Sequence, residues 1–595
     1  MKLSRIYSNQ PRVFLPINFH EGLNVVFGRV LHPTDKQKDS HNLGKSTLVD
    51  LIDFLLLKES LTSHFLELNR IRFTNYVFYL EIQIADNEFI TIRRSVDSSS
   101  KIAFKKHTEK WQDFRELSEQ LWDNVNIPIA TAQKMLDGHL DLDAIGKWSY
   151  RQGVSYFLRT QADYLDVFQI AKYAKGRHSE WKPYLSKLLG FNDALVIEKY
   201  DLEEQIKSLE SNLAALNTNL TEDDYDPIRG KIEIKTDEVQ KVAQRLDSFN
   251  FNEEELKLNK ELVGRIEAQI SANNESLYNL SYEISQIEKS LDIKFDFNVE
   301  EMVEIFDEAK IYFPDKLKKE YSDLVSFNKQ ITKERTAYLK VRLTELRQTE
   351  TKLLAELKTL NATRQNNLSV LTELDSLTKF KQLQKLLAGE QAALNMLNAE
   401  LEMVKRIIQI NNLIRGNEKK LLKIVEELRT EEQNDNPVRK EIRLAFSAII
   451  HSVLNVHALL AAAINAQGNI DFRATILEGN DASKTTSQDK GTSYKKLLCA
   501  SFDLAVLRAY AARKFFHFVY HDGVLEGLDD RKKVCLLENI RKYCAEYKIQ
   551  YILTSIDSDL PRDAEGNKIE FAPEEIVLEL NDGGDDGRLF KMPKF

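Results

Sequence analysis

Residues 41–47 read HNLGKST, and this stretch decides how the rest of the chain is interpreted. Its last four residues match the end of a phosphate-binding loop, whose full pattern is G-x-x-x-x-G-K-[ST]. The apolar run LNVVFG precedes it and STLVDLIDFLLL follows it, which predicts a strand before the loop and a helix after it. A helix that starts at such a loop can hold phosphate groups with its first backbone N–H groups.

The spacing of the loop differs from the usual pattern. The nearest glycine before Gly44 is Gly28, at the end of the predicted strand, so that residues 29–40 would be an insertion. With Gly28 as the first glycine, Asn42 and Gly44 belong to the predicted nucleotide-binding loop. The polar insertion would bulge out beside the nucleotide.

Three side chains at the start of the helix have predicted roles. Lys45 would reach the β- and γ-phosphates of ATP, and Ser46 would be a ligand of Mg²⁺. Thr47 would support the phosphate. The alternative is an ordinary α/β domain with a chance GKST stretch.

The composition limits the class of protein. The chain has 595 residues, 43% of them hydrophobic, and a net charge of −9. That length predicts several domains. The acidic net charge argues against a nucleic-acid-binding protein that is basic throughout. We expect a cytoplasmic protein without membrane contact, since no long apolar run or signal peptide is present, and inert buried thiols at the three cysteines.

The middle of the chain has a different periodicity from its ends. Leucine and isoleucine recur at alternating steps of three and four residues, the a/d pattern of paired helices. This predicts a long antiparallel coiled-coil hairpin inserted between two halves of an α/β head, with a large helical bundle as the alternative. The expected boundaries are 1–194 for the first half of the head, 195–290 for an outgoing arm with joints near 221–231 and 247–255, 291–325 for a small hinge-like tip, 326–436 for a returning arm, and 437–595 for the second half of the head.

The last part of the chain supplies further elements of a nucleotide site. Residues 439–466 are expected to be helical, whereas NIDFRATILEG, KFFHFVYHDG and IQYILTSI predict strands. Asp522 ends the second of these strands, where a carboxylate can hold Mg²⁺. Leu528 and Asp529 follow Asp522 by six and seven residues.

Together these features resemble those of a known family. The order of phosphate loop, apolar strand with Asp522, and then Leu528-Asp529 is similar to that of ABC-type ATPases. With the split head and helical hairpin, the sequence resembles the SMC/RecN-like ABC ATPases, most of all the SMC-like subunits of bacterial anti-phage and anti-plasmid defence systems of the Lamassu type. The resemblance implies ATP and Mg²⁺ as cofactors.

The resemblance also implies roles for residues outside the loop. Gln161, in YFLRTQADYLDVF, would sense Mg²⁺ and the γ-phosphate, and Asp529 would belong to the D-loop. Gly491, Thr492 and Ser493 would cover the ATP that is bound by a second subunit, although this segment has one glycine where the family has two.

Two positions depart from the family's pattern. Gly523 follows Asp522 where the family has the glutamate that orients the attacking water, and Glu526 stands four residues after Asp522 at an offset that points its side chain elsewhere. Ser555 stands where the family often has a switch histidine. We therefore expect slow or activation-dependent hydrolysis, with Glu526 as a displaced catalytic glutamate or without a catalytic role.

The implied function is a homodimer whose heads bind ATP between them and couple its state to double-stranded DNA. The chain would control an effector subunit, such as a nuclease, together with accessory subunits. The alternatives are a repair or chromosome-maintenance ATPase without an effector, and a non-hydrolysing coiled-coil scaffold. For KIAFKKHTEK (101–110) and for Arg93 and Arg94, contact with DNA or nucleotide and a solvated surface both stay open.

Overall fold

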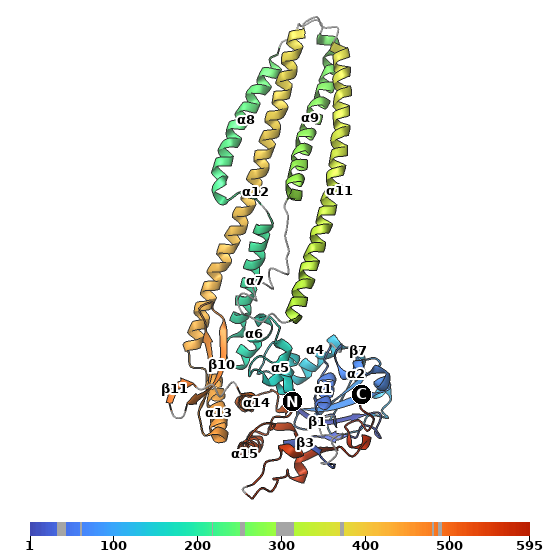
Figure 1. Ribbon diagram of the computed structural model, residues 1–595, viewed down its shortest axis with the longest axis vertical. Coiled ribbons are helices and arrows are strands. Elements are labelled where there is room, and N and C mark those ends of the chain that lie inside the picture. The colour runs from blue at the N-terminus through green and yellow to red at the C-terminus, as the bar shows by residue number, and fades with distance from the viewer. Residues whose placement is uncertain are drawn as a thin grey trace. The chain divides into compact units, whose positions relative to one another are not determined.

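The computed structural model describes residues 1–32, 43–59, 62–216, 218–249, 256–292, 315–368, 374–478, 481–485, 491–563 and 565–595. These residues form two compact units (Figure 1). The head joins Met1–Ile206 to Asn417–Phe595, and the helical unit comprises Lys207–Gly416. Both ends of the chain thus build the head, as the changes in composition predicted. None of the helices in these ranges combines the length and the hydropathy that crossing a bilayer requires.

A parallel five-stranded sheet lies in the head. Its strands are, in sheet order, β14 (Ile576–Asn581), β3 (Gly22–Arg29), β13 (Gln550–Ile556), β12 (Phe518–His521) and β8 (Leu158–Arg159). Strands β3 and β8 come from the N-terminal segment and the other three from the C-terminal segment, so neither segment completes the sheet alone. Every residue of β12 and β13 is buried, as expected for a parallel sheet covered on both faces.

A second sheet in the head is antiparallel. Its strands are β2 (Ile17–Asn18), β1 (Lys2–Ser8), β4 (Val77–Ala85), β5 (Glu88–Ser95), β6 (Lys101–His107) and β7 (Asn124–Pro128). The predicted helix after the phosphate loop is α1 (Lys45–Leu55), which packs against β4 and β5. Strand β1 was not predicted from the sequence, because its polar residues suggested an exposed segment. In the structure Ser4 is buried and donates a 2.6 Å hydrogen bond to Glu81.

The remaining elements of the head are mostly helical. They are α2 (Phe65–Leu68), α3 (Arg70–Phe73), α4 (Ile129–Leu140), α5 (Tyr150–Phe157), the 3₁₀ turn η3 (Gln161–Tyr164), α6 (His178–Leu188), α13 (Pro437–Leu454), α14 (Thr492–Ala509) and α15 (Asp530–Tyr547). Helix α7 (Asp193–Ala215) begins in the head and ends in the helical unit, and α12 (Leu374–Gln433) runs the opposite way.

The helix expected over 439–466 is wrong in its second half. Helix α13 ends at Leu454, and Asn455 adopts the left-handed conformation that often terminates helices. The chain then forms β9 (Ala458–Ile464), which pairs antiparallel with β10 (Ile470–Glu478) and, through it, with β11 (Asp481–Thr485). Alanine and leucine in β9 favour a helix, but pairing with β10 along its whole length outweighs that local preference.

The helical unit contains α8 (Tyr225–Asp247), α9 (Leu256–Asp292), α11 (Asp315–Leu368) and most of α12 (Figure 1). Helix α7 ends at Ala215 and α8 begins at Tyr225, so the chain leaves the helix between them. Pro227 occupies the first turn of α8, where its missing N–H costs no helical hydrogen bond. The expected tip at 291–325 lies largely outside the described residues.

Hydrogen bonds give the direction of α11. Glu267 pairs with Arg364 at 3.0 Å, Ser281 bonds Glu350 at 3.4 Å, and Ser290 bonds Arg335. The numbers rise along α9 while they fall along α11, so these two helices are antiparallel. Apolar side chains fill the seam between them; the buried ones are Ile284, Ile287 and Leu346.

A second antiparallel pair completes the helical unit. Lys235 of α8 forms a 2.6 Å ion pair with Glu390 of α12, and Glu222, just before α8, pairs with Arg415 at 3.2 Å. The described helices therefore form two antiparallel pairs, α8 with α12 and α9 with α11. Each pair joins a helix of the expected outgoing arm to a helix of the expected returning arm, and the sequence left open whether the arms are straight or folded. Heptad spacing gives each helix an apolar face but leaves its partner open.

Candidate nucleotide-binding site

The predicted phosphate loop ends in a backbone conformation that requires glycine. Gly44 has φ 102° and caps the N-terminus of α1. A Cβ atom there would lie 2.7 Å from Cβ of Leu589, closer than real side chains approach. Both the left-handed backbone and the close contact exclude other residues. The expected Asn42 lies outside the described residues, as does most of the expected insertion.

Lys45 lies at the carboxyl end of β3. It is the first residue of α1 and is 9% exposed. A Cβ atom on Gly28 would lie 3.3 Å from the Lys45 ammonium nitrogen, so the side chain returns to the end of the strand that precedes the loop. The structure thus brings together Gly28, Gly44 and Lys45, as the sequence predicted. Thr47 follows on α1 and is half-buried.

Asp522 is the next element of the site. It follows β12 directly and is 1% exposed. The Ser46 hydroxyl donates to its Oδ2 at 2.6 Å, and the Thr554 hydroxyl donates to its Oδ1 at 2.6 Å. Ser46 and Asp522, both predicted ligands of Mg²⁺, therefore meet directly. A hydroxyl and a carboxylate are oxygen ligands of the kind that Mg²⁺ prefers, so these residues fit the ion.

The residue after Asp522 has a conformation that explains why it is glycine. Gly523 has φ 66°, and its N–H donates to the Thr554 hydroxyl at 2.8 Å. A Cβ atom at this position would lie 2.7 Å from Oε1 of Glu526. The expectation that the offset of Glu526 points its side chain elsewhere is therefore wrong. The turn at Gly523 brings the Glu526 carboxylate back over position 523.

Two further side chains hold this carboxylate. Gln161, at the start of η3, donates from Nε2 to Glu526 Oε1 at 3.0 Å. Lys496, in the first turns of α14, donates from Nζ to Glu526 Oε2 at 2.9 Å. The role of Gln161 as a sensor of Mg²⁺ and the γ-phosphate stays a prediction, and its contact with Glu526 places it beside Asp522 and Gly523. Lys496 and Thr554 were not predicted, because Lys496 is one of two adjacent lysines in a polar stretch and Thr554 is a single hydroxyl within an apolar strand.

Asp559 adds a third acidic group at this site, after Asp522 and Glu526. Burial raises the pKa of its carboxyl, and the charge of Glu526 raises it further. Lys533 and Lys45 act in the opposite direction on the same pKa. The pKa of Asp559 is raised overall, so the effects of burial and of Glu526 exceed those of the two lysines.

A buried polar network underlies the site. Arg159 is fully buried and binds both oxygens of Asp503, at 2.5 and 2.9 Å. His521 contacts Asp503 through Nε2 at 2.9 Å and the Tyr551 hydroxyl through Nδ1 at 2.6 Å. Burial lowers the pKa of His521, so the neutral ring is favoured. Because Arg159 and His521 each lie one or two positions before a site residue, the network fixes the strand ends that carry Gln161 and Asp522.

The other predicted site residues lie at element ends. Gly491 caps α14, Thr492 is its first residue, and Ser493 follows. The Ser493 hydroxyl lies 2.8 Å from the place of a Cβ on Gly527, so this segment adjoins the turn after Asp522. Asp529 caps α15 and accepts from the backbone N–H of Arg531.

Ser555 is buried, and its hydroxyl has no hydrogen-bond partner among the described residues. Its neighbour Thr554 bonds Asp522 instead. Successive side chains of a strand point to opposite faces, so Ser555 faces away from Asp522.

Arg94 is not solvated, and Arg93 is only partly exposed. Arg94 is buried, lies over the Phe54 ring and donates to backbone carbonyls, and burial lowers its pKa to about 9. Arg93 pairs with Glu119 at 2.7 Å. Both therefore have structural partners within the head.

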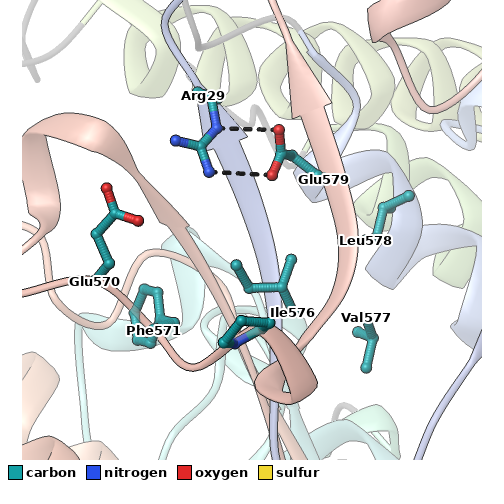
Figure 2. Close-up of a pocket in the computed structure, with 8 residues that line it drawn as sticks. Arg29, Glu570, Phe571, Ile576, Val577, Leu578 and Glu579 are labelled. Carbon is teal, nitrogen blue, oxygen red and sulfur yellow. Dashed lines mark hydrogen bonds and ion pairs between the residues drawn. The ribbon is translucent and has the colours of Figure 1, made fainter.

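A pocket of about 400 Å³ lies beside β3 and β14 (Figure 2). Arg29, which follows Gly28, forms a two-point ion pair with Glu579 at 3.0 and 3.2 Å across it. Glu570 also lines the pocket, together with the apolar residues Phe571, Pro573, Ile576, Val577 and Leu578. Neither Lys45 nor Asp522 lines this pocket, so it is separate from these two predicted site residues.

Comparisons with known proteins give limited matches. A family profile described as "Uncharacterised protein conserved in bacteria (DUF2326)" matches residues 449–594. No curated protein matches the chain. Among solved structures, the chain is similar to the Smc head domain with a coiled coil and joint from Pyrococcus yayanosii, with 15% identity and a TM-score of 0.33, covering 93% of this chain and 92% of that one. It is also similar to the Smc head domain with an extended coiled coil, bound to the C-terminal domain of ScpA, from Pyrococcus furiosus, with 12% identity and a TM-score of 0.34, covering 94% and 90%.

Proposed function

We propose that the head binds ATP with Mg²⁺ and hydrolyses it slowly. The observation that carries this proposal is the 2.6 Å hydrogen bond between Ser46 and Asp522, next to Lys45 and the glycine at the end of β3. Lys45 binds the β- and γ-phosphates, and Ser46 and Asp522 hold Mg²⁺. The bound ion neutralises charge on the phosphate oxygens.

Glu526 acts as the general base in this proposal. Its carboxylate is 31% exposed, so water can reach it, and it lies over Gly523. It accepts a proton from the attacking water as the oxygen of that water bonds to the γ-phosphorus. The bond from the γ-phosphorus to the bridging oxygen breaks, and ADP leaves with the electron pair. Because Glu526 stands four residues after Asp522 and not directly after it, we expect this base to act slowly.

The proposal extends to a dimer and to DNA. Gly491, Thr492 and Ser493 lie at the start of α14, from which they cover the γ-phosphate bound by a second copy. ATP then holds two heads together, and loss of the γ-phosphate releases them. The paired helices of the inserted unit transmit that change to double-stranded DNA, and an effector subunit responds to it, in a defence role of the kind that the sequence resemblance implies.

The direct test compares ATP turnover by the wild-type chain and by Lys45→Ala, each without DNA, with circular DNA and with linear DNA. Lys134→Ala, which removes an exposed lysine of the same head, is the control. We expect turnover that Lys45→Ala abolishes and that Lys134→Ala preserves, with a higher rate in the presence of DNA. Equal wild-type rates in all three DNA conditions would remove the DNA-dependent part. Binding of ATP without any turnover would support the scaffold alternative.

A further inference from the structure

Lys496 makes contacts that the proposed reaction has not used. It lies in the first turns of α14, is 8% exposed, and has its ammonium 5.7 Å from the centre of the Tyr164 ring. Its Nζ donates to the backbone carbonyl of Gly523 at 2.8 Å and to Glu526 Oε2 at 2.9 Å. A buried ammonium loses its hydration, and these two acceptors replace it.

The two acceptors lie at the two ends of one turn. Gly523 begins the turn that follows Asp522, and the backbone N–H of Glu526 returns to the Gly523 carbonyl at 3.3 Å. One ammonium therefore contacts both the carbonyl that begins the turn and the carboxylate that follows it. Charge-assisted hydrogen bonds of this kind are stronger than neutral ones, so this contact restricts the turn and the carboxylate together.

The missing side chain at position 523 leaves the space that this carboxylate fills. A Cβ on Gly523 would meet Glu526 Oε1 at 2.7 Å and Gln161 Nε2 at 3.0 Å. A glutamate three positions later reaches this space through its own side-chain torsions, because Val524 and Leu525 before it are fully buried and hold the backbone. Two donors, Gln161 and Lys496, restrict those torsions by binding one carboxylate oxygen each.

We propose that Lys496 is a positioning residue for ATP hydrolysis, whose ammonium holds the Glu526 carboxylate in the space left by the glycine at position 523. This inference rests on the proposed function, because it assigns Lys496 a role through Glu526. Lys496 itself contacts neither the phosphates nor the attacking water. It also links the start of α14, where the segment that covers the partner's ATP begins, to the general base.

The test uses kcat and KM of the full chain for ATP in saturating Mg²⁺. Lys496→Met removes the ammonium and keeps the length of the side chain, and Lys496→Arg keeps the charge. Lys495→Met is the matched control on the same helix. We expect Lys496→Met to lower kcat by roughly 10- to 100-fold with KM changed by less than about threefold, and Lys496→Arg to recover part of the loss. Lys495→Met should match wild type.

A double variant separates positioning from a general structural effect. Because Lys496 acts through Glu526, the double variant Lys496→Met/Glu526→Gln should be no slower than Glu526→Gln alone. Thermal melts of all variants are measured in parallel. If Lys496→Met melts too low to assay, Lys496→Gln replaces it in the same comparison.

The outcomes distinguish this inference from the proposed function. If wild-type turnover depends on Lys45 but Lys496→Met has the same kcat as wild type, only the role of Lys496 is overturned. The proposed function then stands. A raised KM with unchanged kcat, or losses that add in the double variant, overturns the role of Lys496 as well. Absence of any Lys45-dependent turnover in wild type overturns the proposed function and the inference together.

Discussion

The Ser46 hydroxyl donates a 2.6 Å hydrogen bond to the carboxylate of Asp522, across 476 positions of the chain. Ser46 belongs to the helix that follows the phosphate loop, and Asp522 ends a strand of the C-terminal segment. Strand β3 of the N-terminal segment and strand β13 of the C-terminal segment also lie side by side. The two ends of the chain therefore have to fold together before the proposed Mg²⁺ ligands exist.

Gly523→Glu should not restore the family's catalytic glutamate. The backbone at Gly523 has φ 66°, and a Cβ there would lie 2.7 Å from Glu526 Oε1. Strain of this kind costs about 1–3 kcal/mol. We expect Gly523→Glu to lower both the melting temperature and the rate of ATP turnover. A variant with wild-type stability and faster turnover would show that position 523 accepts the side chain.

Gly523→Ala is the control for that experiment. It carries the same backbone strain without the carboxylate, so we expect a similar loss of stability. Combining Gly523→Ala with Glu526→Ala removes the close contact and should recover part of the loss, as measured by thermal melting. A double variant as unstable as Gly523→Ala alone would mean that backbone strain explains the whole effect.

Asp503→Ala should destabilise the head strongly. Its carboxylate binds the fully buried Arg159 at two points and also contacts His521. Removing one partner of a buried ion pair leaves an uncompensated charge and costs about 3–5 kcal/mol. Replacing both partners, in Arg159→Met/Asp503→Leu, should cost less. Denaturant unfolding measures both, and a double variant less stable than Asp503→Ala would contradict this reading.

The raised pKa of Asp559 predicts that the stability difference between Asp559→Asn and wild type depends on pH. Its pKa is raised in the folded state, so ionisation of its carboxyl disfavours folding, and this effect appears as pH rises through the carboxyl range. The melting temperature of Asp559→Asn relative to wild type should therefore be higher near pH 7 than near pH 4.

The control variant, Asp563→Asn, should show the opposite pH dependence of stability. Backbone N–H groups of Asn567 and Glu565 lower the pKa of the Asp563 carboxyl. The stability that its ionised form contributes is lost as pH falls, so Asp563→Asn should be relatively less stable near pH 7 than near pH 4. Equal pH dependence in both variants would contradict the assignment of Asp559.

The pairing of α9 with α11 can be tested by cross-linking. Ser281 and Glu350 are in hydrogen-bond contact at 3.4 Å, so cysteines at these positions should be joined by a short bismaleimide cross-linker. Cysteines at Ser281 and Tyr338 are the control, because Tyr338 lies more than three helical turns away from Glu350 on α11. Mobility in denaturing gels measures the result. A cross-link in the control alone would exclude the antiparallel register.

The local elements of the site could be predicted from the sequence, but several contacts could not. Apolar runs around β3, α1 and β13 have clear helix or strand periodicity, and GKST fixes the place of Lys45 between two of them. In contrast, β9 has the composition of a helix and becomes a strand only because β10 pairs with it. That pairing depends on contacts between segments, which local propensity does not contain.

The same distinction applies within the site. The departure at Gly523 was visible in the sequence, but its consequence was not. The return of Glu526 over position 523 depends on the positive φ of the glycine and on the donors Gln161 and Lys496. In the helical unit, the leucine spacing gave an apolar face to each helix, while the choice of partner depends on ion pairs such as Glu267 with Arg364.

The central claim is that Lys45, Ser46 and Asp522 bind ATP with Mg²⁺. Calorimetric titration of the full chain with ATP, with and without Mg²⁺, tests it most directly, and Asp586→Asn, at an exposed carboxylate, serves as the control. We predict Mg²⁺-dependent binding by wild type and Asp586→Asn, loss of at least about tenfold in affinity for Lys45→Ala, and loss of the Mg²⁺ dependence for Asp522→Asn. Equal affinities for all four proteins would contradict the account.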